Sequence, residues 1–177
     1  IINYLLSIGT SKNLSKEIEI NNSIKNFDIK NIGISSPRFS LDTLISLNKD
    51  IIRSYNFVNV KHKYSKLELD KIDEQFWNLV KNNINFFNES LDWYNIINSQ
   101  DIYIKESNDI CKIAAELLPN EPYNLESWDN WIKLIQTKTS KKGKELFMPI
   151  RIALTGKEKG PELKYLIPLL SRKHILK

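Results

Sequence analysis

Glycine, cysteine and long apolar runs are scarce in this sequence of 177 residues, which has 5 glycines, 6 prolines and one cysteine. Proteins built from many strands and tight turns use more glycine, so this composition favours helices joined by short loops. The single cysteine, Cys111, excludes an internal disulfide and a cysteine-rich zinc site. No apolar run approaches the roughly 18 residues that a membrane-spanning helix needs, so we expect no membrane partner.

The motifs of common catalytic sites are also missing. The two histidines, His62 and His174, have no paired carboxylate pattern beside them. The sequence contains no glycine-rich phosphate loop, no dinucleotide-binding fingerprint and no zinc-protease motif. We therefore expect neither catalytic residues nor a metal site in this chain.

The charge that is present is unevenly distributed. The net charge is +5, but the segment from Lys133 to the C-terminus carries 12 Lys and Arg against 3 Asp and Glu, and the remainder is mildly acidic. A basic region on an acidic body is typical of proteins that contact nucleic acids. The alternative is a lysine-rich surface that is simply solvated.

Apolar residues recur at helical spacing through most of the chain and predict an all-α fold. Ser40 and Ser127 are expected helix N-caps, and Pro168 should kink or shorten the last helix. The predicted helices cover residues 2–8, 18–27, 41–52, 67–98 (weakened at Asn82 and Asn83), 110–118, 122–135 and 161–175. Residues 53–66 are expected to form a connector and residues 138–144 a basic loop.

Trp128 and Trp131 lie at helical spacing in the predicted helix 122–135. Such aromatic side chains can stack on nucleic-acid bases. Residues at this spacing more often belong to a hydrophobic core, which is the interpretation that we favour here.

The most informative stretch is Phe147-Met148-Pro149-Ile150-Arg151-Ile152-Ala153-Leu154-Thr155-Gly156, followed by Gly160-Pro161-Glu162-Leu163. An apolar run with one arginine ends at a Thr-Gly break, and a basic loop with Lys157 and Lys159 leads to a predicted helix that starts at Pro161. A helix N-terminus beside lysines favours anions. The simpler alternative is a buried segment, a turn and a terminal helix.

This stretch resembles the C-terminal signature of bacterial glutamyl-tRNA synthetases, class I aminoacyl-tRNA synthetases. That signature reads roughly F-x-P-L-R-x-A-L-T-G and then G/T-P-x-L. A second match lies near the start of the chain. There the residues that match the family's pattern, in the same order, are Asn3-Tyr4-Leu5, Gly9, Phe27, Phe39, Leu44, Leu47-Asn48 and Ile52-Arg53. The resemblance thus covers most of the chain.

The resemblance implies a helical stem-contact segment at residues 1–56 and an α-helical-cage anticodon-binding domain at residues 57–177, with a subdivision near residues 100–106. It implies tRNA recognition for glutamate–tRNA ligase, which attaches glutamate to tRNA(Glu) using ATP. The family's H-I-G-H-like and K-M-S-K-S-like motifs are missing here. We therefore expect this piece to be catalytically inactive and to hold no cofactor, with ATP and Mg bound in a catalytic domain outside it. We also expect a cytoplasmic monomer.

The resemblance also implies which residues contact tRNA. Arg151 would pair with a base edge or a phosphate, and the turn Gly160–Leu163 would offer backbone groups to a base. Lysines 157, 159, 141 and 142 would neutralise phosphates. The implied contacts are Lys81, Asn83, Lys141, Lys142, Arg151, Thr155, Lys157, Lys159, Gly160, Pro161 and Leu163. The alternative for Arg151 is a structural salt bridge.

Asn83 occupies a position where family members that reject tRNA(Gln) are expected to carry arginine, with Lys81 two residues earlier. This departure suggests relaxed discrimination, so tRNA(Gln) is a further expected partner.

Two other classes of function remain open at this stage. A basic helical protein-interaction module would show no anticodon preference. A non-specific RNA-binding module would bind with salt-dependent but sequence-indifferent affinity.

Overall fold

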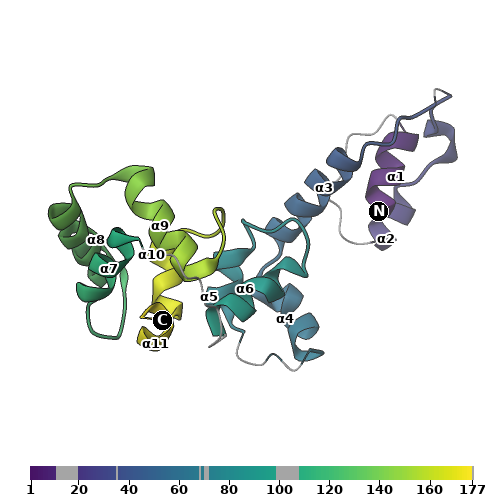
Figure 1. Cartoon of the computed structure of the whole chain (residues 1–177). Coiled ribbons are helices and arrows are strands. Elements are labelled where there is room, and N and C mark those ends of the chain that lie inside the picture. Colours follow the sequence, from purple (N-terminus) through teal and green to yellow (C-terminus); the bar gives the residue numbers. More distant parts are fainter. Residues whose placement is uncertain (11–19, 35, 68, 70–71, 99–107, 177) are drawn as a thin grey trace.

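The computed structural model describes residues 1–10, 20–34, 36–67, 69, 72–98 and 108–176 as an elongated succession of helices (Figure 1). Its N-terminal end is formed by α1 (Ile2–Gly9), α2 (Ile20–Lys25), a 3-10 turn η1 (Ile29–Asn31) and the start of α3 (Leu41–Ser54). Among the described residues the only β-structure is an isolated bridge between Thr10 and Ile32. The all-α prediction is confirmed.

Tyr4 ties α1 to the beginning of α3. Its hydroxyl accepts a hydrogen bond from the Ser40 backbone N at 2.6 Å and donates one to the Ser40 carbonyl at 3.1 Å. Its ring meets that of Phe39 edge to face, with centroids 5.5 Å apart. Ser40 Oγ in turn accepts from Thr43 N, so Ser40 is the N-cap that the sequence predicted.

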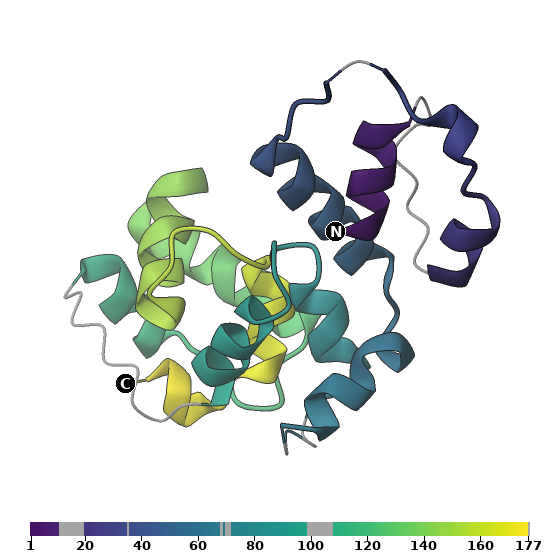
Figure 2. The same ribbon diagram turned by 90° about the vertical axis from the view of Figure 1, so that its right-hand side faces the viewer.

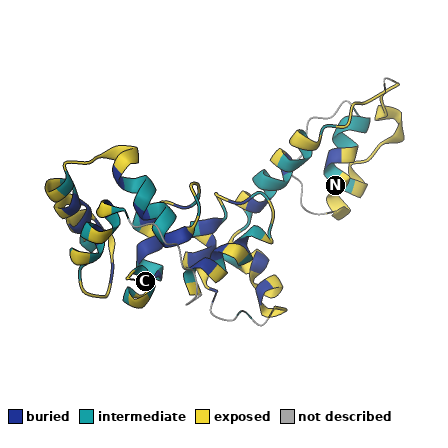
Figure 3. Ribbon diagram, in the orientation of Figure 1, coloured by how far each residue is buried: buried dark blue, intermediate teal, exposed yellow. Residues whose placement is uncertain are grey.

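The N-terminal end carries many solvent-exposed apolar side chains, and Figure 3 shows little buried surface there. Tyr4 is the buried apolar residue of this end within the described part. Most of the large apolar side chains that are exposed among the described residues lie here: Ile1, Ile2, Leu5, Ile20, Ile24, Phe27, Ile29, Ile32, Ile34, Phe39 and Leu41. We call this set the N-terminal apolar surface.

The connector predicted at residues 53–66 is wrong, because a helix, α4 (Phe57–Ser65), lies there. Asn56 and Asn59 form a reciprocal capping box: each side chain accepts a hydrogen bond from the other residue's backbone N, at 3.1 Å and 2.9 Å. Only Val60 and Tyr64 of α4 are buried, so the helix has a short apolar pattern that is easily missed.

The middle of the molecule is a small core around α4, α5 (Glu74–Val80) and α6 (Glu89–Asn98). The predicted helix 67–98 is thus interrupted by a loop, residues 81–88, around the asparagines that weaken it. The core consists of Ile52, Val60, Tyr64, Ile72, Phe76, Trp77, Val80, Ile84, Trp93 and Ile96. Tyr64 donates to Ser90 Oγ at 2.9 Å inside it, and burial raises the pKa of Tyr64 to about 12.

A second core lies toward the C-terminus, between α7 (Asp109–Glu116), α8 (Leu125–Thr139) and α9 (Gly143–Thr155). Trp128 and Trp131 are buried in it, and Trp131 Nε1 donates to the Ala114 carbonyl at 2.9 Å. The prediction that these two residues belong to a core is confirmed. Leu79 and Ile97 pack against both cores and join them.

Two boundaries in this region differ from the prediction. Asn124 is the N-cap of α8, and the predicted cap Ser127 is its partner in a capping box at the third helical position. The predicted basic loop 138–144 is shorter, because α8 continues to Thr139 and α9 begins at Gly143.

The chain ends in three short turns: α10 (Leu163–Leu166), η2 (Ile167–Leu169) and α11 (Arg172–Ile175). The predicted interruption near Pro168 is confirmed, since the 3-10 turn contains it. The predicted helix start at Pro161 is wrong. Pro161 is buried and precedes Glu162, the N-cap of a helix of only four residues. A helix this short offers little dipole to an anion.

Candidate nucleic-acid interface

Two loops that are far apart in the sequence lie side by side in the middle of the molecule (Figure 1, Figure 2). One is residues 81–88, between α5 and α6, and the other is residues 156–162, between α9 and α10. Both loops help to line a groove of about 880 Å³, together with residues of α5, α8, α10 and η2, and we call it the central groove. Its lining residues are Gln75, Asn78, Leu79, Asn82, Asn83, Tyr123, Asn124, Leu125, Gly160, Glu162, Tyr165 and Pro168.

Asn83 reaches the central groove from the first loop. Its backbone N donates to the Val80 carbonyl at 2.8 Å, and its side-chain amide donates to the Leu79 carbonyl at 3.3 Å. Asn83 thus donates to the last two carbonyls of α5, which ends at Val80, while its side chain remains exposed. Lys81 points elsewhere: its Nζ donates to the Tyr55 carbonyl at 3.5 Å, and it does not line the groove.

Arg151 holds the second loop in place. Its Nη1 donates to the Pro161 carbonyl at 2.9 Å, across the end of α9. Partial burial lowers the pKa of Arg151, but a guanidinium stays charged at neutral pH. The structure thus places Arg151 as a brace between α9 and the turn that follows it.

Thr155 and Gly156 shape the end of α9. Thr155 is buried, its hydroxyl donates to the Arg151 carbonyl at 2.8 Å, and Lys157 N donates to that hydroxyl at 3.1 Å. Gly156 takes a left-handed conformation with φ of 67°, which ends the helix. The Thr-Gly break therefore turns the chain toward the central groove.

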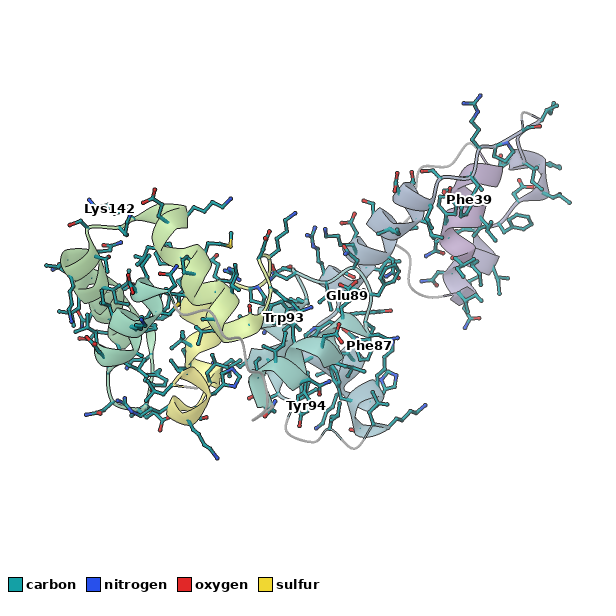
Figure 4. The ribbon with its side chains drawn as sticks, viewed as in Figure 1. Phe39, Phe87, Glu89, Trp93, Tyr94 and Lys142 are labelled. Carbon is teal, nitrogen blue, oxygen red and sulfur yellow. The ribbon has the colours of Figure 1, made fainter. Side chains whose placement is uncertain are left out.

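Trp93 of α6 supports the second loop from below (Figure 4). The ammonium of Lys157 lies 5.7 Å from the Trp93 ring centroid, within reach of a cation–π contact. Gly160 lies so close that a Cβ on it would approach Trp93 to 2.3 Å. Gly160 is thus required by the contact between the loop and the middle core.

The remaining predicted contacts divide into buried and exposed residues. Pro161 and Leu163 are buried, so Gly160 is the predicted residue of this turn that lines the groove. Lys159, Lys141 and Lys142 are exposed. Lys141 pairs with Glu145 at 3.0 Å, and Figure 4 shows Lys142 at the upper left, at the turn between α8 and α9 and away from Trp93.

The sequence predictions did not include several of the residues that line the groove. Gln75, Asn78 and Asn82 are exposed carboxamides along α5 and its end, and Asn124 and Tyr165 face them from α8 and α10. Carboxamides at i, i+3 and i+7 share one helix face, so this spacing could have revealed the set. Amides offer a donor and an acceptor together, and an exposed tyrosine ring offers a stacking surface.

Among the described residues, no helix has the length and apolarity to cross a membrane, and no cluster of His, Cys, Asp and Glu could hold a metal ion. The described groups available for binding are the amides and aromatic rings that line the groove and the lysines of the second loop beside it.

The sequence model of a family described as "Anticodon binding domain" matches residues 56–177. The chain belongs to the anticodon-binding domain family. Curated relatives extend the likeness over the whole chain. Glutamate–tRNA ligase 1 of Ehrlichia ruminantium (strain Gardel) is 35% identical over 100% of this chain and 40% of its own length. Glutamate–tRNA ligase 2 of Bartonella bacilliformis is 36% identical over 95% of this chain and 38% of its own length.

Solved structures show the same fold. A glutamate tRNA ligase from Elizabethkingia meningosepticum superimposes with a TM-score of 0.72 at 16% identity, covering 99% of this chain and 38% of that one. The enzyme from Elizabethkingia anophelis gives a TM-score of 0.68 over 98% of this chain. This anticodon-binding family member thus spans about 40% of the length of the curated relatives that it matches. The glutamyl-tRNA synthetase resemblance inferred from the two sequence signatures is confirmed.

We expect Arg151→Met to lower the free energy of unfolding by about 1 kcal/mol, because it keeps the apolar stem but leaves the Pro161 carbonyl without its donor. Urea unfolding measures this. Arg38→Met, at an exposed arginine of the N-terminal end, is the matched control and should change stability little. Unchanged stability of Arg151→Met together with lost RNA binding would contradict the brace and make Arg151 a direct RNA contact.

Proposed function

We propose that this chain is the tRNA-reading part of a glutamate–tRNA ligase, an enzyme that attaches glutamate to tRNA(Glu) using ATP. The observation that carries the proposal is the meeting of the two loops, with Asn83 and Gly160 on one groove inside an anticodon-binding domain. The names of the relatives support the choice of enzyme. ATP and Mg would act in a catalytic portion of the ligase, while the residues of this chain bind RNA.

The central groove suits unstacked bases of an RNA loop. Single-stranded bases are read by hydrogen bonds to their edges and by stacking on aromatic rings. Asn78, Asn82 and Asn83 supply amide donors and acceptors, and Tyr165 supplies a ring. Lys157 and Lys159 stand on the loop beside the groove, where they would neutralise phosphates.

We further propose that two parts of the chain contact different parts of the tRNA. Residues 1–56 would contact the stem of the tRNA and residues 57–177 its anticodon, in a cytoplasmic monomer. Residues 100–106, where a subdivision was expected, lie outside the described residues. Asn83 in place of an arginine leaves room for tRNA(Gln) as a second partner, since an amide offers no fixed positive charge to discriminate with.

The test is binding of the chain to tRNA(Glu) and to a copy with a swapped anticodon, at two salt concentrations. We expect the swap to weaken binding about tenfold, because base-edge hydrogen bonds of this kind discriminate by roughly 1–3 kcal/mol. Asn78→Ala and Asn83→Ala should reduce this preference. Asn95→Ala, at an exposed asparagine of α6 that does not line the groove, should leave it unchanged.

The other outcomes identify the competing functions. Equal, salt-sensitive affinity for both RNAs would make the chain a non-specific RNA binder. No measurable binding to either RNA would favour a protein-interaction module and overturn the proposal.

A further inference from the structure

The loop 81–88, which brings Asn83 to the central groove, is held from outside the groove by α3. Asn48 Nδ2 donates to the Asn85 carbonyl at 2.6 Å. Arg53 Nη2 donates to the Asn82 carbonyl at 3.3 Å. Both donors come from the C-terminal half of α3, and both acceptors are backbone groups of the loop.

These two contacts enclose Asn83. One fixes the carbonyl of the residue before it, and the other fixes the carbonyl two residues after it. Asn85 is held at its other backbone group as well, because its N donates to Glu89 Oε2 at 2.8 Å. The backbone on both sides of Asn83 is therefore fixed by side chains of α3 and α6.

Neither donor lines the central groove. Asn48 instead lines a small apolar groove of about 280 Å³ on α3, together with Leu44, Ile51 and Phe86. Phe86 comes from the loop itself, so the loop and α3 both line this groove. Arg53 lies 4.0 Å from Asp50, one turn earlier on α3, which keeps its guanidinium beside the helix.

We propose that Asn48 and Arg53 are positioning residues: they set the base discrimination of the central groove by fixing the backbone on either side of Asn83, without touching the RNA themselves. This inference rests on the proposed reading of an anticodon in that groove. Hydrogen-bond readout of a base requires its donors to be held close to one geometry, and residues behind the readers supply that rigidity. Loss of either contact should relax discrimination more than it weakens binding.

The experiment measures the ratio of affinities for tRNA(Glu) and the anticodon-swapped copy with Asn48→Leu and Arg53→Met. Leucine is close to asparagine in size, suits the apolar groove around Asn48 and cannot donate to Asn85. We expect each variant to reduce the affinity ratio about threefold, in the range of energetic coupling through side chains that touch neither ligand. Lys49→Met removes a positive charge from the same helix and should leave the ratio unchanged.

The salt dependence of binding separates positioning from direct contact. A cation that touches a phosphate contributes about −0.7 to the slope of log affinity against log salt for single strands. Arg53→Met should leave this slope as in the unmodified chain. A shallower slope with an unchanged affinity ratio would show that Arg53 binds phosphate and would overturn its positioning role.

The proposed function and this inference fail differently. If the unmodified chain does not distinguish the two RNAs, the proposed function fails. If it distinguishes them and Asn48→Leu, folded as judged by circular dichroism, distinguishes them equally well, only the positioning role is wrong. A variant that fails to fold is replaced by Asn48→Ser, which shortens the side chain and also removes the contact; retained discrimination in Asn48→Ser contradicts the proposal in the same way.

Discussion

Gly160→Ala should remove the anticodon preference that we propose for this chain and lower its thermal stability. An added Cβ would approach two carbons of the buried Trp93 ring to 2.3 and 2.4 Å, closer than any relaxed contact allows. Either the second loop or the indole must move. Overpacking of this kind costs about 1–3 kcal/mol. Movement of the loop would also displace Lys157, whose ammonium lies over the same ring. It would shift the edge of the central groove that Gly160 forms.

The measurement combines thermal unfolding with binding to tRNA(Glu) and its anticodon-swapped copy. Gly9→Ala is the matched control, because a Cβ at Gly9 would meet nothing within 4 Å. That control should keep both its stability and its RNA preference. If Gly160→Ala behaves like Gly9→Ala, the contact with Trp93 does not determine the shape of the groove.

Trp77→Ala should bring the chain close to unfolding at ambient temperature. Trp77 is fully buried, and its ring packs against those of Tyr64 and Phe87, with centroids 6.3 Å away in both cases. Its Nε1 donates to the Tyr55 carbonyl at 2.9 Å. Removing a buried indole costs about 3–5 kcal/mol. That is a large part of the 5–15 kcal/mol by which a domain is usually stable.

Urea unfolding followed by circular dichroism tests this expectation. Trp77→Phe should cost less than Trp77→Ala, since it keeps one aromatic ring, although it loses the bond to Tyr55 and part of the buried volume. Val58→Ala, on the exposed side of α4, should shift the free energy of unfolding by no more than about 0.5 kcal/mol. A Trp77→Ala chain as stable as Val58→Ala would mean that the middle core does not hold the protein together.

Elements with a strong local signal could be predicted from the sequence. Ser40 caps α3 as expected because the cap and the apolar face of that helix are encoded within a few residues of one another. Trp128 and Trp131 are in the core, as their spacing indicated. The helix α4 was missed because its cap is an Asn56–Asn59 pair and it buries only two side chains.

The arrangement of the central groove depends on contacts that no local pattern records. Arg151 carries a charge that suits a phosphate, but its partner, the Pro161 carbonyl, is decided by how α9 and the following turn pack. Pro161 is buried for the same reason, although prolines are common at helix starts. The carboxamides of Gln75 and Asn78 line a common groove only because the fold brings Asn124 and Tyr165 opposite them.

Contacts made by the N-terminal apolar surface and contacts made by the exposed lysines, such as Lys142 and Lys159, should change in strength in opposite directions as salt is added. Contacts between cations and phosphates weaken as salt rises, because counterions compete for the RNA. Contacts between apolar side chains, such as Ile1, Leu5 and Leu41, are strengthened by sulfate and similar salts, which are excluded from protein surfaces. Binding measured over a salt series therefore distinguishes the two kinds of contact. Binding that strengthens with added sulfate involves the N-terminal apolar surface, and binding that weakens as salt rises involves contacts between lysines and RNA.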